Sequence, residues 1–432
     1  MSEPERVHQM REDWNRRARE DAYYYVAFAK RDQDDEGFFA TASDVVRSLE
    51  RELRRAPARE GGRRALEIGC GPARLMRPLG RHFAEIHGVD VSDEMVRRAR
   101  ANLADVPHAS VWQNDGARLD RFAGGYFDFV YSYAVFQHIP IRDVVFTYLR
   151  EAARVLAPGG VFRFQANSLP YDPANCDTWH GVSITPREVS SFARDNGLQL
   201  LAMEGINSQY MWVTLRRPAA PPGAQSSEAR LAPAHVSNPQ TGESLVPCSG
   251  RFATVCVWFR DFPDEVDLND LEATVDDLPA RPYCIGPPEV DGYRQVNVEL
   301  PQGVGTGLRP MQFRVRGRPA EPTIWIRLIP PGPWVPELRS VTDSVNVLCG
   351  PRIVSGAVRL SIEELSHPER LRIAMDGVPV AKFAITCVDP VAAHYEVSFP
   401  CPAGLAPGRH AVQAEIGTRR LPPVWVEVEP AS

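Results

Sequence analysis

Short apolar runs alternate with amphipathic stretches between Ala65 and Leu215, and no other feature constrains the fold as strongly. This alternation predicts a parallel sheet with crossover helices. The expected strands are Ala65 to Ile68, Glu85 to Val89, Ala109 to Gln113, Phe127 to Tyr131 and Gly160 to Gln165, and the expected helices lie near Met95 to Leu103 and Val144 to Val155. Two later runs, Leu198 to Gly205 and Tyr210 to Arg216, are too close together for a parallel crossover and should form an antiparallel hairpin.

The length of 432 residues predicts two or three domains, because a single hydrophobic core rarely grows that large. Residues 1–217 are expected to form the α/β domain. Residues 218–247 are rich in Pro, Ala, Ser and Gly, which is typical of a linker. The remainder shows strand-like segments with Pro and Gly turns, so we expect all-β sandwich modules at 248–335 and 336–432.

A weak internal repeat divides the second half of the chain. Leu271–Pro279 resembles Leu371–Pro379 at an offset of about 100 residues, close to the size of one immunoglobulin-like module. Trp325 is echoed by Trp425 at the same offset. We interpret the repeat as tandem immunoglobulin-like sandwiches, with a single larger β-domain as the alternative.

Composition excludes several classes of protein. The apolar runs are shorter than the roughly 18 residues of a membrane span, so none is predicted. The charged N-terminus lacks the apolar centre of a secretory signal, which favours a cytoplasmic location. A net charge of -6 argues against a nucleic-acid partner. The eight cysteines lack the spacing of a zinc site, so no metal is expected.

The segment Leu66–Arg74 reads Leu-Glu-Ile-Gly-Cys-Gly-Pro-Ala-Arg and connects a predicted strand to a predicted helix. Gly69 and Gly71 lack a Cβ atom, which lets the backbone bend tightly against a ligand. Asp90 ends the next strand about 20 residues later, where a carboxylate can accept hydrogen bonds from ribose hydroxyls. A dinucleotide turn would carry a third glycine where Arg74 stands, which argues against a nicotinamide-dependent oxidoreductase.

Over about the first 217 residues the sequence resembles class I S-adenosylmethionine-dependent methyltransferases. Glu67-Ile-Gly-Cys-Gly71 matches the first motif of that family, Glu/Asp-x-Gly-x-Gly. Further matches follow in order at Asn114-Asp-Gly116, Asp128 to Ser132 and Leu156 to Gly160. The resemblance implies a Rossmann-like, seven-stranded, mostly parallel sheet and S-adenosyl-L-methionine as cofactor.

The resemblance also implies roles for individual residues in cofactor binding. It assigns Glu67, Gly69 and Gly71 to the methionine moiety, Asp90 to the ribose, and Asp115 with Gly116 to the adenine. Asp115 could instead be an ordinary turn aspartate, and Glu67 could cap a nearby backbone group. Ala73 departs from the glycine that the family often has at its position.

His138 is the candidate catalytic base. It lies just past the fourth predicted strand, at the edge where ligands of open α/β sheets bind. Histidine titrates near neutral pH and can accept a proton from an alcohol. The alternative is a structural role that ties the loop to the sheet.

Two segments supply candidate residues for the methyl acceptor. The long connection after the fifth strand contributes Tyr171, Trp179 and His180, a mixture suited to a substrate-binding lid. A helical segment near the N-terminus contributes Tyr24, where the family often places a cover over the cofactor. The alternatives are a surface loop pinned by Trp179 and the apolar face of an ordinary helix.

The sequence lacks the Asn/Asp-Pro-Pro motif of nucleobase amine methyltransferases, so we expect methyl transfer to an oxygen, or less favourably a nitrogen, of a small molecule or glycan. The rival hypothesis is a non-catalytic scaffold or carbohydrate-binding protein with a degenerate Rossmann-like half. Tryptophans in the second half could stack on sugar rings or belong to the core. The sandwiches could also mediate self-association or bind a partner.

Overall fold

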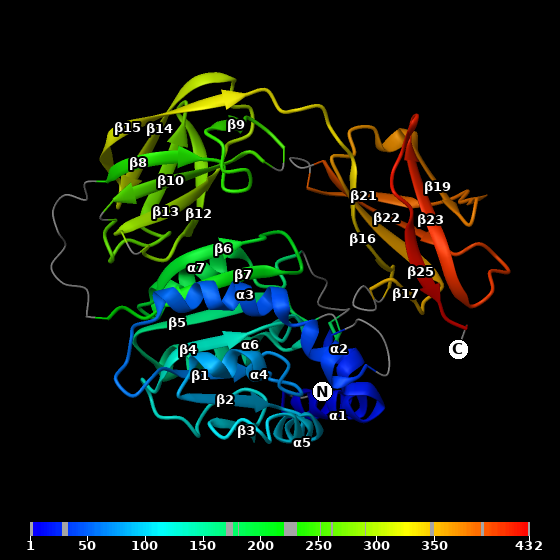
Figure 1. Ribbon diagram of the computed structural model, residues 1–432, viewed down its shortest axis with the longest axis horizontal. Helices are drawn as coiled ribbons and strands as arrows, with labels where there is room; N and C mark the ends of the chain where they lie inside the picture. Colours follow the sequence, from blue (N-terminus) through cyan, green and yellow to red (C-terminus); the bar gives the residue numbers. More distant parts are fainter. Residues whose placement is uncertain are drawn as a thin grey trace. The chain divides into compact units, whose positions relative to one another are not determined.

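The computed structural model describes residues 3–27, 33–169, 176–179, 181–219, 231–250, 252–260, 262–289, 291–345, 350–389 and 393–430 (Figure 1). Contacts divide the chain into two compact units. The first comprises Met1–Ser244, Val255–Pro301 and Arg309–Ile326, and the second Leu245–Thr254, Gln302–Leu308 and Arg327–Ser432. Among the described residues, none of the helices combines the length and apolarity that a bilayer crossing requires.

The first seven strands along the chain lie in the sheet order β3-β2-β1-β4-β5-β7-β6. Their bounds are β1 Arg64–Ile68, β2 Glu85–Asp90, β3 Ala109–Gln113, β4 Phe127–Ser132, β5 Leu156–Ala166, β6 Gln199–Glu204 and β7 Met211–Arg216. The first five are parallel, and β7 runs antiparallel to both β5 and β6. The mostly parallel Rossmann-like sheet and its terminal hairpin are therefore confirmed.

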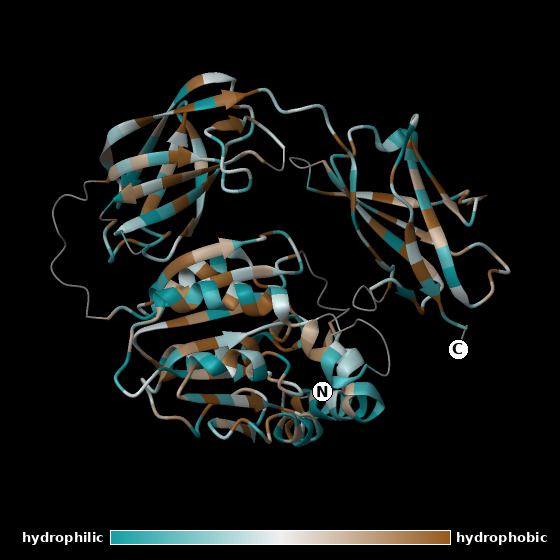
Figure 2. Cartoon of the chain, in the orientation of Figure 1, coloured by the Kyte–Doolittle hydropathy of each residue, from teal (hydrophilic) through white to brown (hydrophobic). Residues whose placement is uncertain are grey.

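Helices cover both faces of this sheet (Figure 1). They are α1 Glu3–Ala27, α2 Asp35–Ala40, α3 Ser43–Glu52, α4 Met76–Leu79, α5 Asp93–Asn102, α6 Arg142–Val155 and α7 Pro186–Asp195. Neighbouring residues of β1 point to opposite faces, so Ala65 packs in the core with α3, α4 and α5, and Leu66 in the core with α6 and α7. The helices carry both hydrophilic and hydrophobic residues, as expected for one buried face each (Figure 2).

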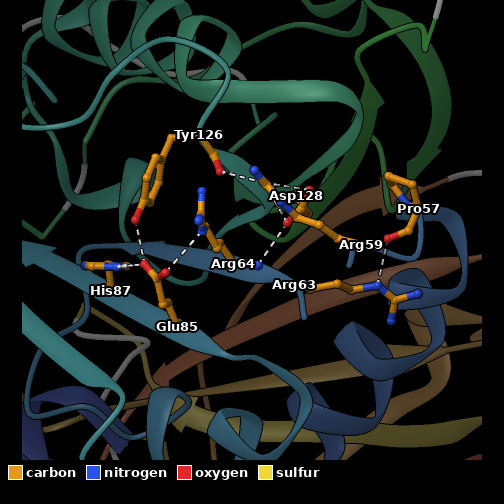
Figure 3. A network of polar contacts seen from close by, with 8 residues as sticks. All are labelled: Pro57, Arg59, Arg63, Arg64, Glu85, His87, Tyr126 and Asp128. Atoms are coloured by element: carbon orange, nitrogen blue, oxygen red, sulfur yellow. Dashed lines mark hydrogen bonds and ion pairs between the residues drawn. The ribbon is translucent and has the colours of Figure 1, made fainter. Parts of the chain in front are cut away.

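Polar contacts tie together the amino ends of β1, β2 and β4 (Figure 3). Asp128 accepts a hydrogen bond from the Arg64 amide at 2.9 Å and pairs with Arg59 at 3.3 Å. Glu85 pairs with the Arg64 guanidinium at 3.1 Å and accepts a hydrogen bond from the Tyr126 hydroxyl at 2.5 Å. These acidic groups therefore connect adjacent strands at their amino ends, opposite the carboxyl edge where ligand binding was predicted.

The first β region begins earlier than predicted. Its strands are β8 Ala232–Ser237, β9 Leu245–Pro247, β10 Thr254–Arg260, β11 Leu271–Val275, β12 Leu278–Ile285, β13 Tyr293–Glu299, β14 Gly307–Val315 and β15 Arg318–Ile329. Within the predicted linker 218–247, β8 pairs with β10 and β9 pairs with β15. The prediction of a linker is therefore wrong for residues 232–237 and 245–247, because their proline and alanine content conceals strands that depend on distant partners.

Within the first compact unit, β12 lies against the outer edge of β6. Cys284 of β12 is the register partner of Ala202 of β6. The chain before β11 adds two hydrogen bonds, from the Leu268 amide to the Leu200 carbonyl and from the Leu200 amide to Asp267 Oδ2, both 2.9 Å. The backbone of β6 thus has partners on both of its sides.

The last strands form two sheets. The orders are β16-β18-β22-β21 and β17-β25-β23-β19-β20, with β24 paired to β23. Their bounds are β16 Glu337–Asp343, β17 Arg352–Ile353, β18 Ala357–Glu363, β19 Leu371–Met375, β20 Val378–Pro379, β21 Ala384–Asp389, β22 His394–Pro400, β23 Gly408–Ile416, β24 Arg419–Arg420 and β25 Val424–Val428. Leu360 and Phe399 of the first sheet share one core with Ile373 and Val412 of the second. This arrangement is a two-layer β-sandwich.

The segments predicted to repeat have the same strand pairing. β11 pairs with β12 and β14, and β19 pairs with β20 and β23. Asp276 and Asp376 occupy the equivalent turns, both with positive φ, at 53° and 49°. Trp325 and Trp425 are 59% and 48% exposed, so neither belongs to a core.

Candidate active site

A cavity lies at the carboxyl ends of the parallel strands. It is lined by Met10, Trp14, Tyr25, Val26, Glu67, Gly69, Cys70, Gly71, Arg74, Leu75, Asp90, Val91, Met95, Tyr133, Ala134, Val135, His138, Ile139 and Tyr148. Most of these residues come from α1, from the end of β1 and the turn after it, from the end of β2 and from the segment after β4, and α5 and α6 contribute Met95 and Tyr148. The cavity therefore occupies the crevice where doubly wound sheets bind ligands.

The glycine turn after β1 bends tightly beneath the cavity. Gly69 has φ of 71°, and a Cβ atom there would lie 2.4 Å from Cγ2 of Val135. The amides of Gly69 and Cys70 both donate to the Val89 carbonyl, at 2.8 and 3.0 Å, which ties the turn to the end of β2. Gly69 is thus required both by the backbone conformation and by the close approach of Val135.

Ala73 occupies the third position of the turn with φ of 68°, and it is fully buried. The left-handed region is unfavourable for a residue with a Cβ atom, by about 1–2 kcal/mol. The departure from glycine at this position therefore introduces local strain, which the surrounding fold maintains.

Asp90 links the glycine turn to the loop after β2. Its Oδ2 accepts a hydrogen bond from the Gly71 amide and its Oδ1 accepts one from the Ser92 amide, both 2.9 Å. Burial raises the pKa of Asp90 to about 6, although both amides favour the charged form. Each carboxylate oxygen retains acceptor capacity for a ligand hydroxyl.

Glu67 lies beside this turn and is only 3% exposed. The Tyr131 hydroxyl donates to its Oε2 at 2.9 Å. Burial raises the pKa of Glu67 to about 8, while Tyr131, Arg74 and the backbone at Met76 act in the opposite direction. The backbone contact agrees with the predicted capping alternative, and the position in the cavity wall agrees with a ligand contact.

Two carboxyl groups with raised pKa values, of the buried Glu67 and the half-buried Asp90, thus share one cavity. The side-chain hydrogen bonds described for these two groups come from a tyrosine hydroxyl to Glu67 and from backbone amides to Asp90. A ligand that brought positive charge and hydroxyl donors would restore the solvation that burial removes from these groups. This pair of acceptor groups suits a cationic ligand with a vicinal diol.

His138 ends a single 3-10 turn at Phe136–His138 and lines the same cavity. Its Nδ1 lies 3.1 Å from the Trp179 carbonyl oxygen, and the ring is 3% exposed. Trp14 of α1 contacts the imidazole edge-on, with ring centroids 5.7 Å apart. The structure therefore places the candidate base and the two carboxyl groups around one space.

Several predicted residues lie elsewhere. Asp115 is exposed, and its Oδ1 caps a turn by accepting from the amides of Ala117 and Arg118, which agrees with the turn-aspartate alternative. A Cβ atom on Gly116 would approach Val7 of α1 to 3.0 Å, so its small size serves helix packing. Neither lines the cavity, and their adenine role stays a prediction.

The predicted acceptor residues are only partly described. Tyr24 is 2% exposed and does not line the cavity, whereas its neighbour Tyr25 does, because successive side chains of a helix point about 100° apart. Trp179 lies next to His138, with ring centroids 6.1 Å apart. Tyr171 and His180 lie outside the described residues.

Sequence reasoning did not single out Tyr148 or assign Arg74 to the cavity wall. Tyr148 extends from α6, and its hydroxyl accepts a hydrogen bond from Asn114 Nδ2 at 2.7 Å. Arg74 is 6% exposed, and its Nη1 donates to the carbonyl and the hydroxyl oxygen of Thr41, each at 3.2 Å. The apolar periodicity of α6 conceals Tyr148 among core residues, whereas the position of Arg74 directly after the glycine turn was a usable signal.

Comparison with known proteins indicates which reaction the α/β domain catalyses. Residues 66–164 match the family model described as methyltransferase domain. The chain is 26% identical to a ubiquinone biosynthesis O-methyltransferase of Methylococcus capsulatus, over 38% of this chain and 74% of that protein. It is 28% identical to a malonyl-[acyl-carrier protein] O-methyltransferase of Enterobacter lignolyticus, over 40% of this chain and 65% of that protein.

Among solved structures, the chain matches the magnesium protoporphyrin IX methyltransferase of Synechocystis with bound SAH, at 16% identity and a TM-score of 0.36, covering 48% of this chain and 97% of that one. The family match spans the glycine turn, Asp90 and His138, which line the cavity together with residues of α1. The chain carries a methyltransferase domain, and it is an S-adenosylmethionine-dependent methyltransferase.

Proposed function

We propose that this enzyme transfers the methyl group to an oxygen atom of a small molecule or glycan and that His138 accepts the proton from that oxygen. The observation that carries the proposal is the position of His138 in the wall of the cavity that also contains Glu67 and Asp90. A nitrogen acceptor is the second candidate. The relatives named as O-methyltransferases support oxygen as the first choice.

The described residues fit S-adenosylmethionine in the following way. The carboxyl groups of Glu67 and Asp90 suit its positive charge and its ribose hydroxyls, respectively, and the glycine turn admits its methionine portion. When bound, it supplies a methyl group whose bond to a positively charged sulfur breaks as the acceptor atom forms its new bond, with the electron pair remaining on sulfur. The protein then needs to align the acceptor and to exclude water.

His138 would remove the proton that a hydroxyl acceptor must lose. The Trp179 carbonyl at Nδ1 requires a proton on that nitrogen when the ring is neutral, which leaves the basic lone pair on Nε2. General-base catalysis of this kind contributes about 10²–10⁴-fold to a rate. An acceptor that is already ionised would not need His138.

The test is to follow S-adenosylhomocysteine release by the full chain with panels of phenols, alcohols, glycans and amines. We expect hydroxyl compounds to be turned over, and we expect His138→Ala to lose about 10²-fold or more in kcat while the Kd for S-adenosylmethionine is unchanged. His108→Ala, which removes an imidazole outside the cavity lining, is the matched control and should leave kcat unchanged. Turnover restricted to amines, or unchanged turnover in His138→Ala, would contradict the proposal.

A further inference from the structure

Arg17 is a buried cation on the helix that covers the cavity. The residue is 4% exposed, and its guanidinium lies over the ring of Trp14 at 4.7 Å and over the ring of Trp179 at 4.1 Å. Burial lowers the pKa of Arg17, and Asp13 acts in the opposite direction. Removing a guanidinium from water is costly, so this position calls for a compensating set of contacts.

Those contacts connect α1 to the segment at 176–179. Nη1 of Arg17 donates to the Thr178 carbonyl at 3.3 Å, and Nη2 donates to the Thr178 hydroxyl at 2.9 Å. The Thr178 hydroxyl donates in turn to Oδ2 of Asp13 at 3.0 Å. The hydroxyl thus bridges two residues of α1, one cationic and one anionic.

The residue after Thr178 contacts the candidate base. The Trp179 carbonyl oxygen lies 3.1 Å from Nδ1 of His138, and both Trp14 and Trp179 contact the imidazole edge-on. The two rings that stack on Arg17 are therefore the two rings that enclose His138. A short path of direct contacts joins the guanidinium to the imidazole.

We propose that Arg17 is a positioning residue for His138: it fixes Thr178 and Trp179 so that the Trp179 carbonyl holds the proton on Nδ1 and leaves Nε2 as the basic nitrogen. The catalytic value of this arrangement rests on the proposed function above. Arg17 touches neither donor nor acceptor in this mechanism. Its effect passes through the backbone of Thr178 and Trp179.

Other bonds also hold this segment, and they define the competing explanation. The Trp179 amide donates to Oδ1 of Asp177 at 2.7 Å, and the Gly181 amide donates to the Gln137 carbonyl at 2.9 Å. If these two bonds sufficed to hold the Trp179 carbonyl, Arg17 would serve only to attach α1. The tautomer of His138 separates the two explanations, because only positioning predicts that it depends on Arg17.

The experiment is 15N NMR of the full chain labelled at histidine, recorded at a pH high enough that the His138 shifts no longer change with pH, so that the ring is neutral. The His138 signals are assigned from their loss in His138→Ala. We expect a single Nδ1-H tautomer in the wild type. Arg17→Ala should raise the ratio of the Nε2-H tautomer to the Nδ1-H tautomer by at least about fivefold, the factor that corresponds to one lost hydrogen bond of ~1 kcal/mol.

Two further variants make the result decisive. Thr178→Val removes the bridging hydroxyl at similar volume and should shift the tautomer in the same direction, even if Arg17→Ala does not fold. Arg19→Ala, at an exposed position two residues further along α1, is the matched control and should leave the tautomer unchanged. An unaltered tautomer in folded Arg17→Ala or Thr178→Val would overturn the proposal.

The outcome for Arg17 is distinguishable from the outcome for the proposed function, because the NMR measurement requires no acceptor. If the tautomer shifts but His138→Ala retains turnover, the positioning stands and the assignment of His138 as base fails. If the tautomer is unaltered and His138→Ala loses turnover, the base stands and the role of Arg17 is refuted.

Discussion

Acidic residues have opposite surroundings at the two ends of the parallel sheet. At the amino ends of β2 and β4, Glu85 and Asp128 are paired with arginines, and the Tyr126 hydroxyl together with these charges lowers the pKa of Glu85 (Figure 3). At the carboxyl ends of β1 and β2, burial raises the pKa of Glu67 and Asp90. One end satisfies its charges internally and stabilises the fold, whereas the other leaves them to be satisfied by a ligand.

The largest effect is expected from Gly69→Ala, which damages the carboxyl end directly. The added Cβ would meet Val135 at 2.4 Å at a positive φ, and the combined strain should cost about 2–5 kcal/mol of unfolding free energy and abolish cofactor binding. Urea denaturation and calorimetric titration measure the two effects. Gly197→Ala is the matched control, with φ of 62° and no atom within 4 Å of the added Cβ. It should lower the free energy of unfolding only by the cost of a positive φ in a residue with a Cβ atom.

Asp128→Ala tests the amino end alone. It removes the acceptor of the Arg64 amide and the partner of Arg59, so we expect a loss of about 1–3 kcal/mol in unfolding free energy. The Kd for S-adenosylmethionine should stay unchanged, since the site lies at the other end of the strand. Weakened cofactor binding in the folded variant would show that the two ends are coupled.

Asp90→Ala is the reciprocal experiment at the carboxyl end. The loss of its ribose hydrogen bonds should weaken S-adenosylmethionine by roughly 1–3 kcal/mol, or about 5- to 150-fold in Kd. Stability should fall less than in Asp128→Ala, because the raised pKa of Asp90 shows that its charged form is unfavourable in the folded protein, and its removal offsets the lost bonds to Gly71 and Ser92. Calorimetry at fixed pH provides the measurement, and an unchanged Kd would remove Asp90 from the site.

The pH dependence should have opposite signs at the two ends. Because the pKa values of Glu67 and Asp90 are raised, the folded protein binds more protons than the unfolded chain at intermediate pH. The free energy of unfolding therefore falls as pH rises from the unfolded pKa of each group to its folded pKa, which is about 8 for Glu67 and about 6 for Asp90. Glu85, with a lowered pKa, contributes stability above its unfolded value that is lost as pH falls. Cofactor affinity should increase between pH 6 and 8 by up to about tenfold per unit, as Glu67 ionises to receive positive charge.

This pH prediction is checked by titrating S-adenosylmethionine at several pH values in wild type and Glu67→Gln. The variant should lose the slope between pH 6 and 8. An identical slope in Glu67→Gln would assign the proton to another group.

The smallest effect is expected from Ala73→Gly. Glycine removes the strain of φ at 68°, but it also increases the entropy of the unfolded chain, so stability should rise by no more than about 1 kcal/mol. Ala99→Gly in α5 should have the opposite sign, because there the helix interior favours alanine. A destabilised Ala73→Gly would show that packing of the methyl group outweighs the strain.

The parts of the structure that were predictable are those encoded locally. β3 has the predicted bounds, and the turn from Glu67 to Gly71 with Asp90 followed from spacing, because each feature lies within a few residues of its own signal. The contacts of Asp115 and Gly116 were not predictable, since they depend on how a turn closes and on the approach of α1 from the start of the chain.

The acceptor side shows the same limit. His138 was identified by its place after the fourth strand, but its partner Trp179 lies 41 residues away, and the contact between them exists only in the folded chain. Arg17 gave no signal at all, because a single arginine in a charged N-terminal helix is indistinguishable from its exposed neighbours. Its surroundings combine the nearby ring of Trp14 on the same helix with the ring of Trp179, which is distant in sequence.

The pairing of β12 along β6 bears on any attempt to isolate the catalytic half. A chain cut at residue 217 would leave β6 with a row of unsatisfied amides and carbonyls along a strand that is almost entirely buried. Such a strand is a template for intermolecular β-pairing, and the truncated protein should tend to oligomerise or aggregate. The following strands thus protect the edge of the catalytic sheet.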